Sequence, residues 1–93
     1  MKDNILTIRQ SNKPGSHRTG SLKNINKTQI AEILGFEPNV SDDPYKVENS
    51  WGFTVDGVFG AIWDYKGSHR YGVFSTYGPK EIFVKLFGAD RVE

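Results

Sequence analysis

The sequence predicts a small α+β domain in which two helices cover an antiparallel sheet. Three observations support this prediction: a strong hairpin signal in the middle of the chain, over residues 51–65, and one helix signal on either side of it. A chain of 93 residues is expected to form a single domain over residues 1–93. The expected order of elements is ββαβββα, or βαβββα if the first segment is irregular.

The N-terminal part of the chain predicts two short strands joined by a turn. Apolar residues favour a first strand over residues 5–9. Residues 10–16 are polar and include a Pro-Gly pair, which is typical of a turn. Residues 19–25 then favour a second strand that returns as a hairpin with the first, although Gly20 weakens it.

A first helix is expected to begin after Asn26 and to end at Gly35. Asn26 can act as the N-cap, with Gln29 as its capping-box partner three residues later. Apolar residues follow at helical spacing, at Ile30, Ile33 and Leu34. Glycine commonly closes a helix. Residues 36–48 are rich in proline and aspartate and predict a loop.

The clearest signal is the hairpin around Asp56-Gly57, a dipeptide that favours a two-residue turn. A turn at these two residues predicts one core face, made of Trp51, Phe53, Val55, Val58 and Ile62. The other face carries Gly52, Thr54, Phe59, Ala61, Trp63 and Tyr65. This second face is too apolar for water alone, and the small residues at its centre leave a depression. We therefore expect it to meet a helix, another subunit or a ligand.

The last part of the chain predicts a strand and a second helix. Residues 71–76 favour the strand. Gly78-Pro79 favours a helix start with proline at the first position, and Gly88 is placed to stop that helix.

Composition excludes several classes of site. The chain has no cysteine, which excludes disulfides and thiolate metal sites, and two histidines make a weak case for zinc. We therefore expect no metal and no cofactor. The N-terminus shows no signal peptide and no segment approaches the length of a membrane span, so a cytoplasmic protein is expected.

Charge is distributed unevenly along the chain. Residues 1–30 contain six Lys and Arg and one acid, whereas residues 31–93 contain six Lys and Arg and ten acids. A basic first third attracts phosphates. The near-neutral total charge of +1 disfavours both an acidic DNA mimic and an unselective DNA binder.

The tetrapeptide Gly-Ser-His-Arg occurs twice, at residues 15–18 and 67–70. Glycine lets backbone N–H groups turn inward, serine adds a hydroxyl, and arginine adds a planar fork of donors, a combination that suits a phosphate. The alternative is two solvated turns that share four common loop residues by accident. With their neighbours, the two copies predict a ligand-binding set of Arg18, Thr19, Ser21, Lys23, Trp63, Tyr65, Lys66, Ser68, His69 and Arg70.

Each part of this set has an expected role and a structural alternative. The cations and hydroxyls would hold phosphates, and Trp63 or Tyr65 would stack on a base. Alternatively, a helix covers the two aromatic residues as part of the core. Lys66 could instead form an ion pair with a nearby carboxylate, and such a surface pair contributes little to stability.

Catalysis is not expected. The chain has no nucleophile elbow and no Walker-type or dinucleotide fingerprint. His17-Arg18-Thr19 matches the His-x-Thr element of the two-histidine phosphoesterases, but the second copy has Tyr71 where those enzymes need Ser or Thr. A ribonuclease-like mechanism with His17 and His69 as base and acid, and Lys66 holding the phosphate, stays formally open.

Several short sequence patterns occur in order between residues 19 and 88. They are Thr-Gly-Ser-Leu at 19–22, Leu-Gly-Phe at 34–36, Lys46 before Trp-Gly-Phe at 51–53, Trp-Asp-Tyr-Lys-Gly-Ser at 63–68 and Phe-Gly at 87–88. In this the chain resembles small accessory proteins of phages and other mobile elements. The resemblance implies an anti-defence inhibitor that occludes a host protein or sequesters a nucleotide second messenger in the host cell.

The leading expectation is a non-enzymatic protein that sequesters a nucleotide messenger, such as a cyclic oligonucleotide or an ADP-ribose derivative. A chain this small encloses such a ligand best across a subunit interface, so a homo-oligomer is expected. One alternative is a protein-binding inhibitor of a CRISPR or restriction component, acting through the aromatic face or the acidic loop at 37–48. The other is a weak nucleic-acid-binding module that uses the basic first third.

Overall fold

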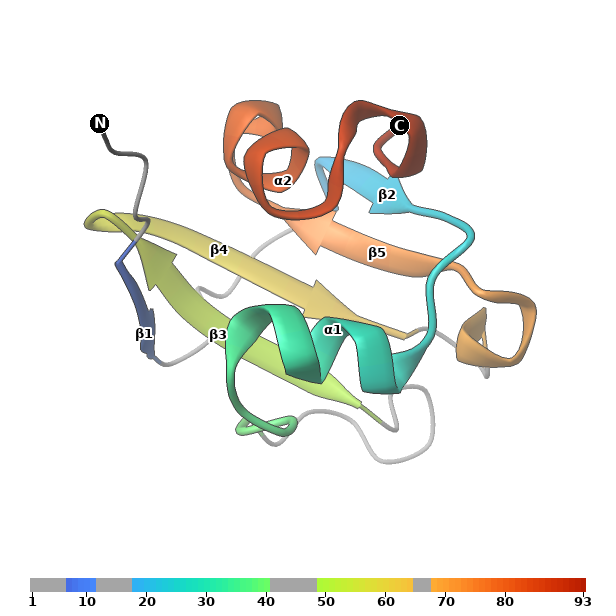
Figure 1. Ribbon diagram of the computed structural model, residues 1–93, viewed down its shortest axis with the longest axis horizontal. Coiled ribbons are helices and arrows are strands. Elements are labelled where there is room, and N and C mark those ends of the chain that lie inside the picture. Colours follow the sequence, from blue (N-terminus) through green and yellow to red (C-terminus); the bar gives the residue numbers. More distant parts are fainter. Residues whose placement is uncertain (1–6, 12–17, 41–48, 65–67) are drawn as a thin grey trace.

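The sheet and helices follow the expected order ββαβββα (Figure 1). The computed structural model describes residues 7–11, 18–40, 49–64 and 68–93. The strands are β1 (Ile8–Gln10), β2 (Gly20–Leu22), β3 (Ser50–Val55), β4 (Val58–Trp63) and β5 (Phe74–Tyr77). The helices are α1 (Lys27–Leu34) and α2 (Lys80–Phe87), with two short 3-10 helices, η1 (Ser68–Tyr71) and η2 (Ala89–Arg91). The five strands form one antiparallel sheet in the order β1-β3-β4-β5-β2, which confirms the predicted α+β class.

The central hairpin has the predicted register. Its three core-face pairs are Trp51 with Ile62, Phe53 with Gly60 and Val55 with Val58. Asp56 and Gly57 both have positive φ, at 51° and 85°, as a tight hairpin turn requires. Val58, expected in the core, is 40% exposed because it lies at the turn end of the hairpin.

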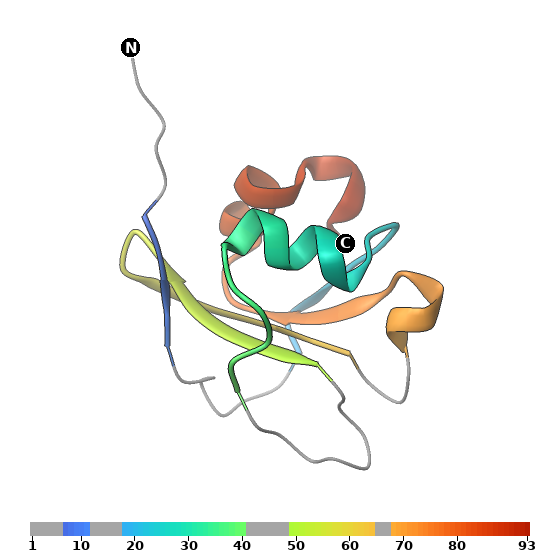
Figure 2. The same cartoon turned by 60° about the horizontal axis from the view of Figure 1, so that its bottom comes forward.

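The core lies between the sheet and the two helices, which cover the same face (Figure 2). Two edge-to-face ring pairs pack in this core. Trp51 and Phe74, both in the sheet, have centroids 6.1 Å apart, and Phe53 of the sheet lies 6.2 Å from Phe83 of α2. Gly60 leaves room for this packing. A Cβ at Gly60 would lie 2.9 Å from both Phe53 Cε2 and Ile82 Cδ1.

The caps of α1 are those that the sequence predicts. Gln29 N donates to Asn26 Oδ1 at 2.8 Å, and Asn26 N donates to Gln29 Oε1 at 3.0 Å. Gly35 closes the helix in the left-handed conformation at φ 93°. For α2, Pro79 is the N-cap rather than the first helical residue, and no side chain caps the first turn.

The predicted N-terminal hairpin is wrong, because β1 and β2 lie at opposite edges of the sheet (Figure 1). β1 pairs with β3, placing Ile8 opposite Val55, and β2 pairs with β5, placing Leu22 opposite Phe74. Leu22 is fully buried there, so the core rather than the neighbouring strand determines where β2 lies. Residues 1–6 and 12–17, which carry the rest of this prediction, lie outside the described residues.

The strand predicted over residues 71–76 begins later, at Phe74. Residues 68–71 form η1 instead, and Gly72 turns the chain at φ 71°. Of the predicted loop, residues 41–48 lie outside the described part.

The outer edge of β2 is covered by residues 91–93, called here the 91–93 segment. Ser21 N donates to Glu93 O at 3.2 Å, Glu93 N donates to Ser21 O at 2.9 Å, and Lys23 N donates to Arg91 O at 2.8 Å. Lys23 Nζ also lies 3.1 Å from Glu93 Oε2. These contacts fix the segment beside the strand.

At the opposite edge of the sheet, β1 and residues 39–40 both form hydrogen bonds with β3. Asn39 N and Val40 N donate to Ser50 O at 3.1 and 3.2 Å. The Asn39 side chain links residue 11, which follows β1, to β3. Its Nδ2 donates to Ser11 O and Gly52 O, and its Oδ1 accepts from Gly52 N at 3.0 Å.

Candidate functional site

A pocket opens where the start of β2 and the end of β5 meet α2 and the 91–93 segment. Its volume is about 170 Å³. The residues that line it are Thr19, Gly20, Thr76, Gly78, Lys80, Phe83, Val92 and Glu93. We call it the β2–α2 pocket. Among these lining residues, Thr19 belongs to the predicted binding set and the others do not.

Thr19 builds one wall of the pocket. Its backbone N donates to Thr76 O at 2.8 Å. Its hydroxyl donates to Gly78 O at 3.1 Å and accepts from Gly78 N at 3.1 Å. Because both roles of the hydroxyl are filled, Thr19 positions the wall rather than offering its oxygen to a ligand.

Thr76 places a hydroxyl-bearing side chain at the pocket. The residue is 3% exposed, and among the described residues the buried side-chain atom without a hydrogen-bond partner is Ser50 Oγ, not Thr76 Oγ1. Gly20 lies directly opposite on β2, and a Cβ there would be 3.2 Å from Thr76 Oγ1 and 2.7 Å from Glu93 O. Glycine at position 20 therefore allows β2 to lie this close to Thr76 and to the 91–93 segment.

The charges around the pocket favour an anion. Lys80 lines it and is exposed, and the N-terminus of α2 has no capping side chain. A helix N-terminus carries about half a positive charge on its free N–H groups. Arg18, exposed and next to Thr19, adds a second cation. The carboxylate of Glu93 is paired with Lys23 at 3.1 Å.

Arg70, from the second repeated tetrapeptide, lies at the other end of the β2–β5 ladder from Arg18. Arg18 is next to Thr19, whose hydroxyl donates to Gly78 O. Arg70 lies two residues before Gly72, whose O accepts from Ile25 N at 3.3 Å. Extended chain from residue 19 to 25 spans about 20 Å. Figure 1 shows η1 and the start of α2 at opposite ends of β5. Within one chain, the ladder therefore does not bring the two arginines to one pocket.

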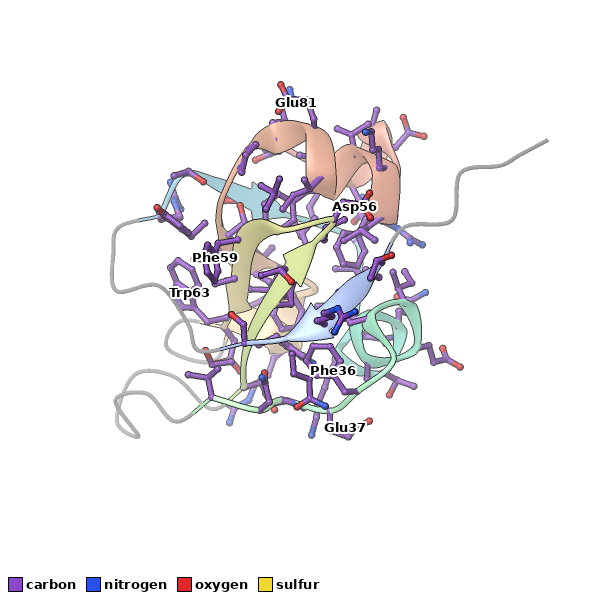
Figure 3. The ribbon with its side chains drawn as sticks, turned by 90° about the vertical axis from the view of Figure 1, so that its left-hand side faces the viewer. Phe36, Glu37, Asp56, Phe59, Trp63 and Glu81 are labelled. Atoms are coloured by element: carbon purple, nitrogen blue, oxygen red, sulfur yellow. The ribbon has the colours of Figure 1, made fainter. Side chains whose placement is uncertain are left out.

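Trp63, expected as a stacking platform, is only 7% exposed and has little free surface for a base. It projects from β4 together with Phe59 on the side away from α1 (Figure 3). Ala61, between them in sequence, is fully buried, so the expected open depression at the centre of this face is covered. Phe59 is 55% exposed at the rim.

The remaining predicted residues fall into three groups. Ser21 and Lys23 hold the 91–93 segment through their backbone and, for Lys23, through the ion pair. Tyr65 and Lys66 lie outside the described residues, as does His17. Ser68 and His69 are described as backbone of η1 only.

Sequence reasoning missed Thr76 and Lys80. A signal for Lys80 was present, because Gly78-Pro79 directly after a strand indicates a helix start without a capping side chain. No comparable signal marked Thr76. Its exposure to the pocket depends on its pairing with Gly20, which joins segments far apart in the sequence.

Tyr71 was also not singled out as a contact residue, yet it is 83% exposed. Exposed apolar side chains gather at two separate places, Tyr71 with Val73 beside η1, and Val58 with Phe59 beside the hairpin turn. They do not form one continuous patch.

The described residues contain no group of three His, Asp or Glu that could hold a metal ion. In the same part of the chain, no helix is long and apolar enough to cross a bilayer. No protein-family model matches this chain, and neither a search of curated proteins nor one of solved structures finds a match.

Proposed function

We propose that this chain is a non-enzymatic binding protein that holds the phosphate of a nucleotide-like ligand in the β2–α2 pocket. One observation carries the proposal: the pocket brings the exposed Lys80 and the uncapped first turn of α2 together with the Thr76 side chain.

The donors around the pocket suit a phosphate. Lys80 brings an ammonium group, the first turn of α2 brings free N–H groups, and Thr76 brings its hydroxyl. A hydrogen bond to a charged group contributes about 1.5–3 kcal/mol. Since about 1.4 kcal/mol corresponds to a factor of ten, loss of the Lys80 ammonium should weaken binding roughly ten- to hundredfold.

Binding is favoured over catalysis by the composition of the pocket. Those of its lining residues that the structure describes include no histidine, and the hydroxyl of Thr19 is engaged on both sides. Their one carboxylate side chain, Glu93, is paired with Lys23. A nucleophile beside a base, which covalent catalysis needs, is not present among these residues.

The wider role that we propose is sequestration of a nucleotide second messenger in the cytoplasm of a host cell, as the resemblance to phage accessory proteins implies. A pocket of about 170 Å³ leaves most of such a ligand outside. A second copy of the chain would cover the remainder, so we propose a homo-oligomer. Light scattering with and without ligand measures the mass of the assembly, and a monomer in both conditions would contradict this part.

Calorimetry with AMP, ADP-ribose and a cyclic dinucleotide tests phosphate binding. Lys80→Gln removes the ammonium at the pocket, and Lys85→Gln is the matched control, because Lys85 is an exposed lysine of α2 that does not line the pocket. We expect Lys80→Gln to weaken binding and Lys85→Gln to leave it unchanged. If no compound binds the unmodified protein, or if both variants bind alike, the proposal is wrong.

A protein-binding inhibitor is the second candidate, and the exposed Tyr71 beside Arg70 favours it. Tyrosine and arginine are enriched among residues that dominate binding energy at interfaces. A purified host defence complex should then lose its affinity for Tyr71→Ala and keep it for Lys80→Gln. The opposite pattern would favour the pocket. For the nucleic-acid alternative, the basic residues Arg9 and Lys23 lie near opposite edges of the sheet, so they do not form one track.

A further inference from the structure

We infer that the outer edge of β1 binds an extended acidic segment of a partner protein, which adds to the sheet as a further strand. This edge lies across the sheet from the β2–α2 pocket, so binding here does not depend on the phosphate (Figure 1). Three observations lead to it: backbone groups without a partner, an exposed arginine, and a different environment on each face of the strand.

The hydrogen bonds between β1 and β3 show which backbone groups of β1 point away from the sheet. Asp56 N donates to Thr7 O at 2.8 Å, and Ser11 N donates to Gly52 O at 2.9 Å. In an antiparallel pair, residues that bond to the neighbouring strand alternate with residues whose N–H and C=O point to the other side. Residues 7, 9 and 11 therefore face β3, and residues 8 and 10 turn their backbone groups outward.

The outward groups of Ile8 and Gln10 are open to a new strand. β1 is the last strand on its side of the sheet. In the part of the chain that the structure describes, no residue forms a hydrogen bond with these outward groups. A peptide that adds to a sheet edge gains affinity from such main-chain bonds and specificity from alternate side chains.

Arg9 determines the charge that an added strand should carry. Ile8 packs against the core and side chains alternate along a strand, so Arg9 lies on the face away from the helices. Arg9 is exposed, and no carboxylate of the described residues forms an ion pair with it. The residue opposite Arg9 would be in a non-hydrogen-bonded pair, where Cα atoms are about 4.5 Å apart. An acidic side chain is attracted there and a basic one is repelled.

The two faces of β1 extend this charge preference to a sequence pattern. Ile8 is partly buried against the core, so an apolar residue opposite it continues the buried layer. Gln10 lies on the same face but is exposed, so a polar residue suits the place opposite it. Read from its N-terminus, an antiparallel partner therefore carries a polar, an acidic and an apolar residue in succession.

A second copy of the chain fits this edge less well. If two β1 strands pair antiparallel about residue 9, the two Arg9 side chains lie directly opposite each other, and like charges there are destabilising. A register shifted by two residues avoids this contact. It leaves only one of the two outward residues of β1 facing its counterpart. An acidic segment of another protein meets neither restriction.

Titration with three short peptides, followed by ¹H–¹⁵N NMR, tests the pattern. The matching peptide is acetyl-Ser-Thr-Glu-Val-Ser-amide, and acetyl-Ser-Thr-Lys-Val-Ser-amide differs from it only in charge. In acetyl-Ser-Thr-Val-Glu-Ser-amide the acidic and the apolar side chain exchange faces. We expect the matching peptide to shift the amides of Ile8 and Gln10, and each of the other two to bind at least about threefold more weakly. High salt should reduce the difference between the Glu and Lys peptides.

Variants of the edge separate the backbone contacts from the charge. Gln10→Pro removes an outward N–H and no bond to β3, and proline occurs at such positions of edge strands. It should weaken the matching peptide roughly fivefold, whereas Gln10→Ala keeps the N–H and should change the affinity little. Arg9→Glu should reverse the preference, so that the Lys peptide binds more tightly. Lys85→Glu makes the same change of charge on α2 and should leave the preference unchanged. If unfolding curves show that Gln10→Pro is not folded, Arg9→Glu decides the result.

Several outcomes would overturn the inference. Equal binding of the three peptides, or an unchanged preference in Arg9→Glu, would show that charge and register do not select the partner. Shifts away from β1, or no binding, would show that this edge takes no added strand. If the shifts at Ile8 and Gln10 appear without peptide as the protein concentration rises, and light scattering shows a dimer, a second copy occupies the edge instead. None of these results bears on phosphate binding, which Lys80→Gln tests separately.

Discussion

Replacing Gly60 by alanine should destabilise the protein, although alanine usually suits a strand better than glycine. Gly60 lies opposite Phe53 in the hairpin and beneath α2. The added Cβ would lie 2.9 Å from Phe53 Cε2 and 2.9 Å from Ile82 Cδ1, closer than carbon atoms normally approach. Ile82 is also buried, so its Cδ1 can move aside only at a cost. The Phe53 ring is fully buried and packed edge-on against Phe83, so it cannot yield without moving its neighbours.

The magnitude follows from two opposing terms. Overpacking a buried position costs about 1–3 kcal/mol. Replacing glycine by alanine in a strand recovers about 0.5–1 kcal/mol of backbone entropy. The free energy of unfolding should therefore fall by roughly 1–2 kcal/mol. For a domain of this size each kcal/mol shifts the midpoint of thermal unfolding by about 4–8 °C, so Tm should fall by roughly 5–15 °C.

The assay is thermal and urea unfolding of Gly60→Ala, Ile82→Val and the double variant. Ile82→Val alone removes a buried methyl group and should cost about 0.5–1.5 kcal/mol. In the double variant the lost Cδ1 makes room for the new Cβ, so the two costs should fall short of their sum by at least about 0.5 kcal/mol. A Gly60→Ala protein as stable as the unmodified one, or costs that simply add, would refute this account of the packing.

The remaining predictions concern polar contacts, and each is measured by urea unfolding. Asn26→Ala removes the oxygen that caps α1 and should lower the free energy of unfolding by about 1 kcal/mol; no loss would mean that the capping box is dispensable. Asn39→Ala removes three side-chain hydrogen bonds at the edge of β3 and should cost about 1 kcal/mol, with faster amide exchange at Gly52. Lys23→Gln breaks an exposed pair with Glu93 and should cost less than about 1 kcal/mol, an effect that high salt should abolish.

The elements that the sequence predicted well are those specified by neighbouring residues. Asp56 and Gly57 both take positive φ, and that turn alone fixes the register of β3 against β4. Asn26, Gln29 and Gly35 likewise fix both ends of α1 through bonds within one or two turns of chain. In each case the deciding contacts lie close in sequence, so local chemistry is sufficient.

The positions of β1 and β2 could not be predicted in this way. Each strand has three residues, and nothing in the chain between them distinguishes a hairpin from two separate edge strands. The deciding contacts are Ile8 with Val55 and Leu22 with Phe74, which join segments about fifty residues apart. Such pairings depend on the whole core.

The candidate site shows the same division. Thr19 was predicted, because a threonine beside glycine and cations is visible in the sequence. Thr76 was not, because its place beside the pocket depends on its pairing with Gly20. For Trp63, alternation along the strand gave the correct face of the hairpin, but its burial depends on residues elsewhere in the chain.

The 91–93 segment has a consequence for how molecules of this protein meet in concentrated solution. An open strand edge offers unpaired N–H and C=O groups, on which another chain can add as an extra strand and begin aggregation. Here the segment already uses the outward groups of Ser21 and Lys23. Shortening the chain after Asp90 should therefore expose a template for aggregation at β2. The 91–93 segment should thus limit edge-to-edge aggregation, and its Val92 and Glu93 also line the pocket.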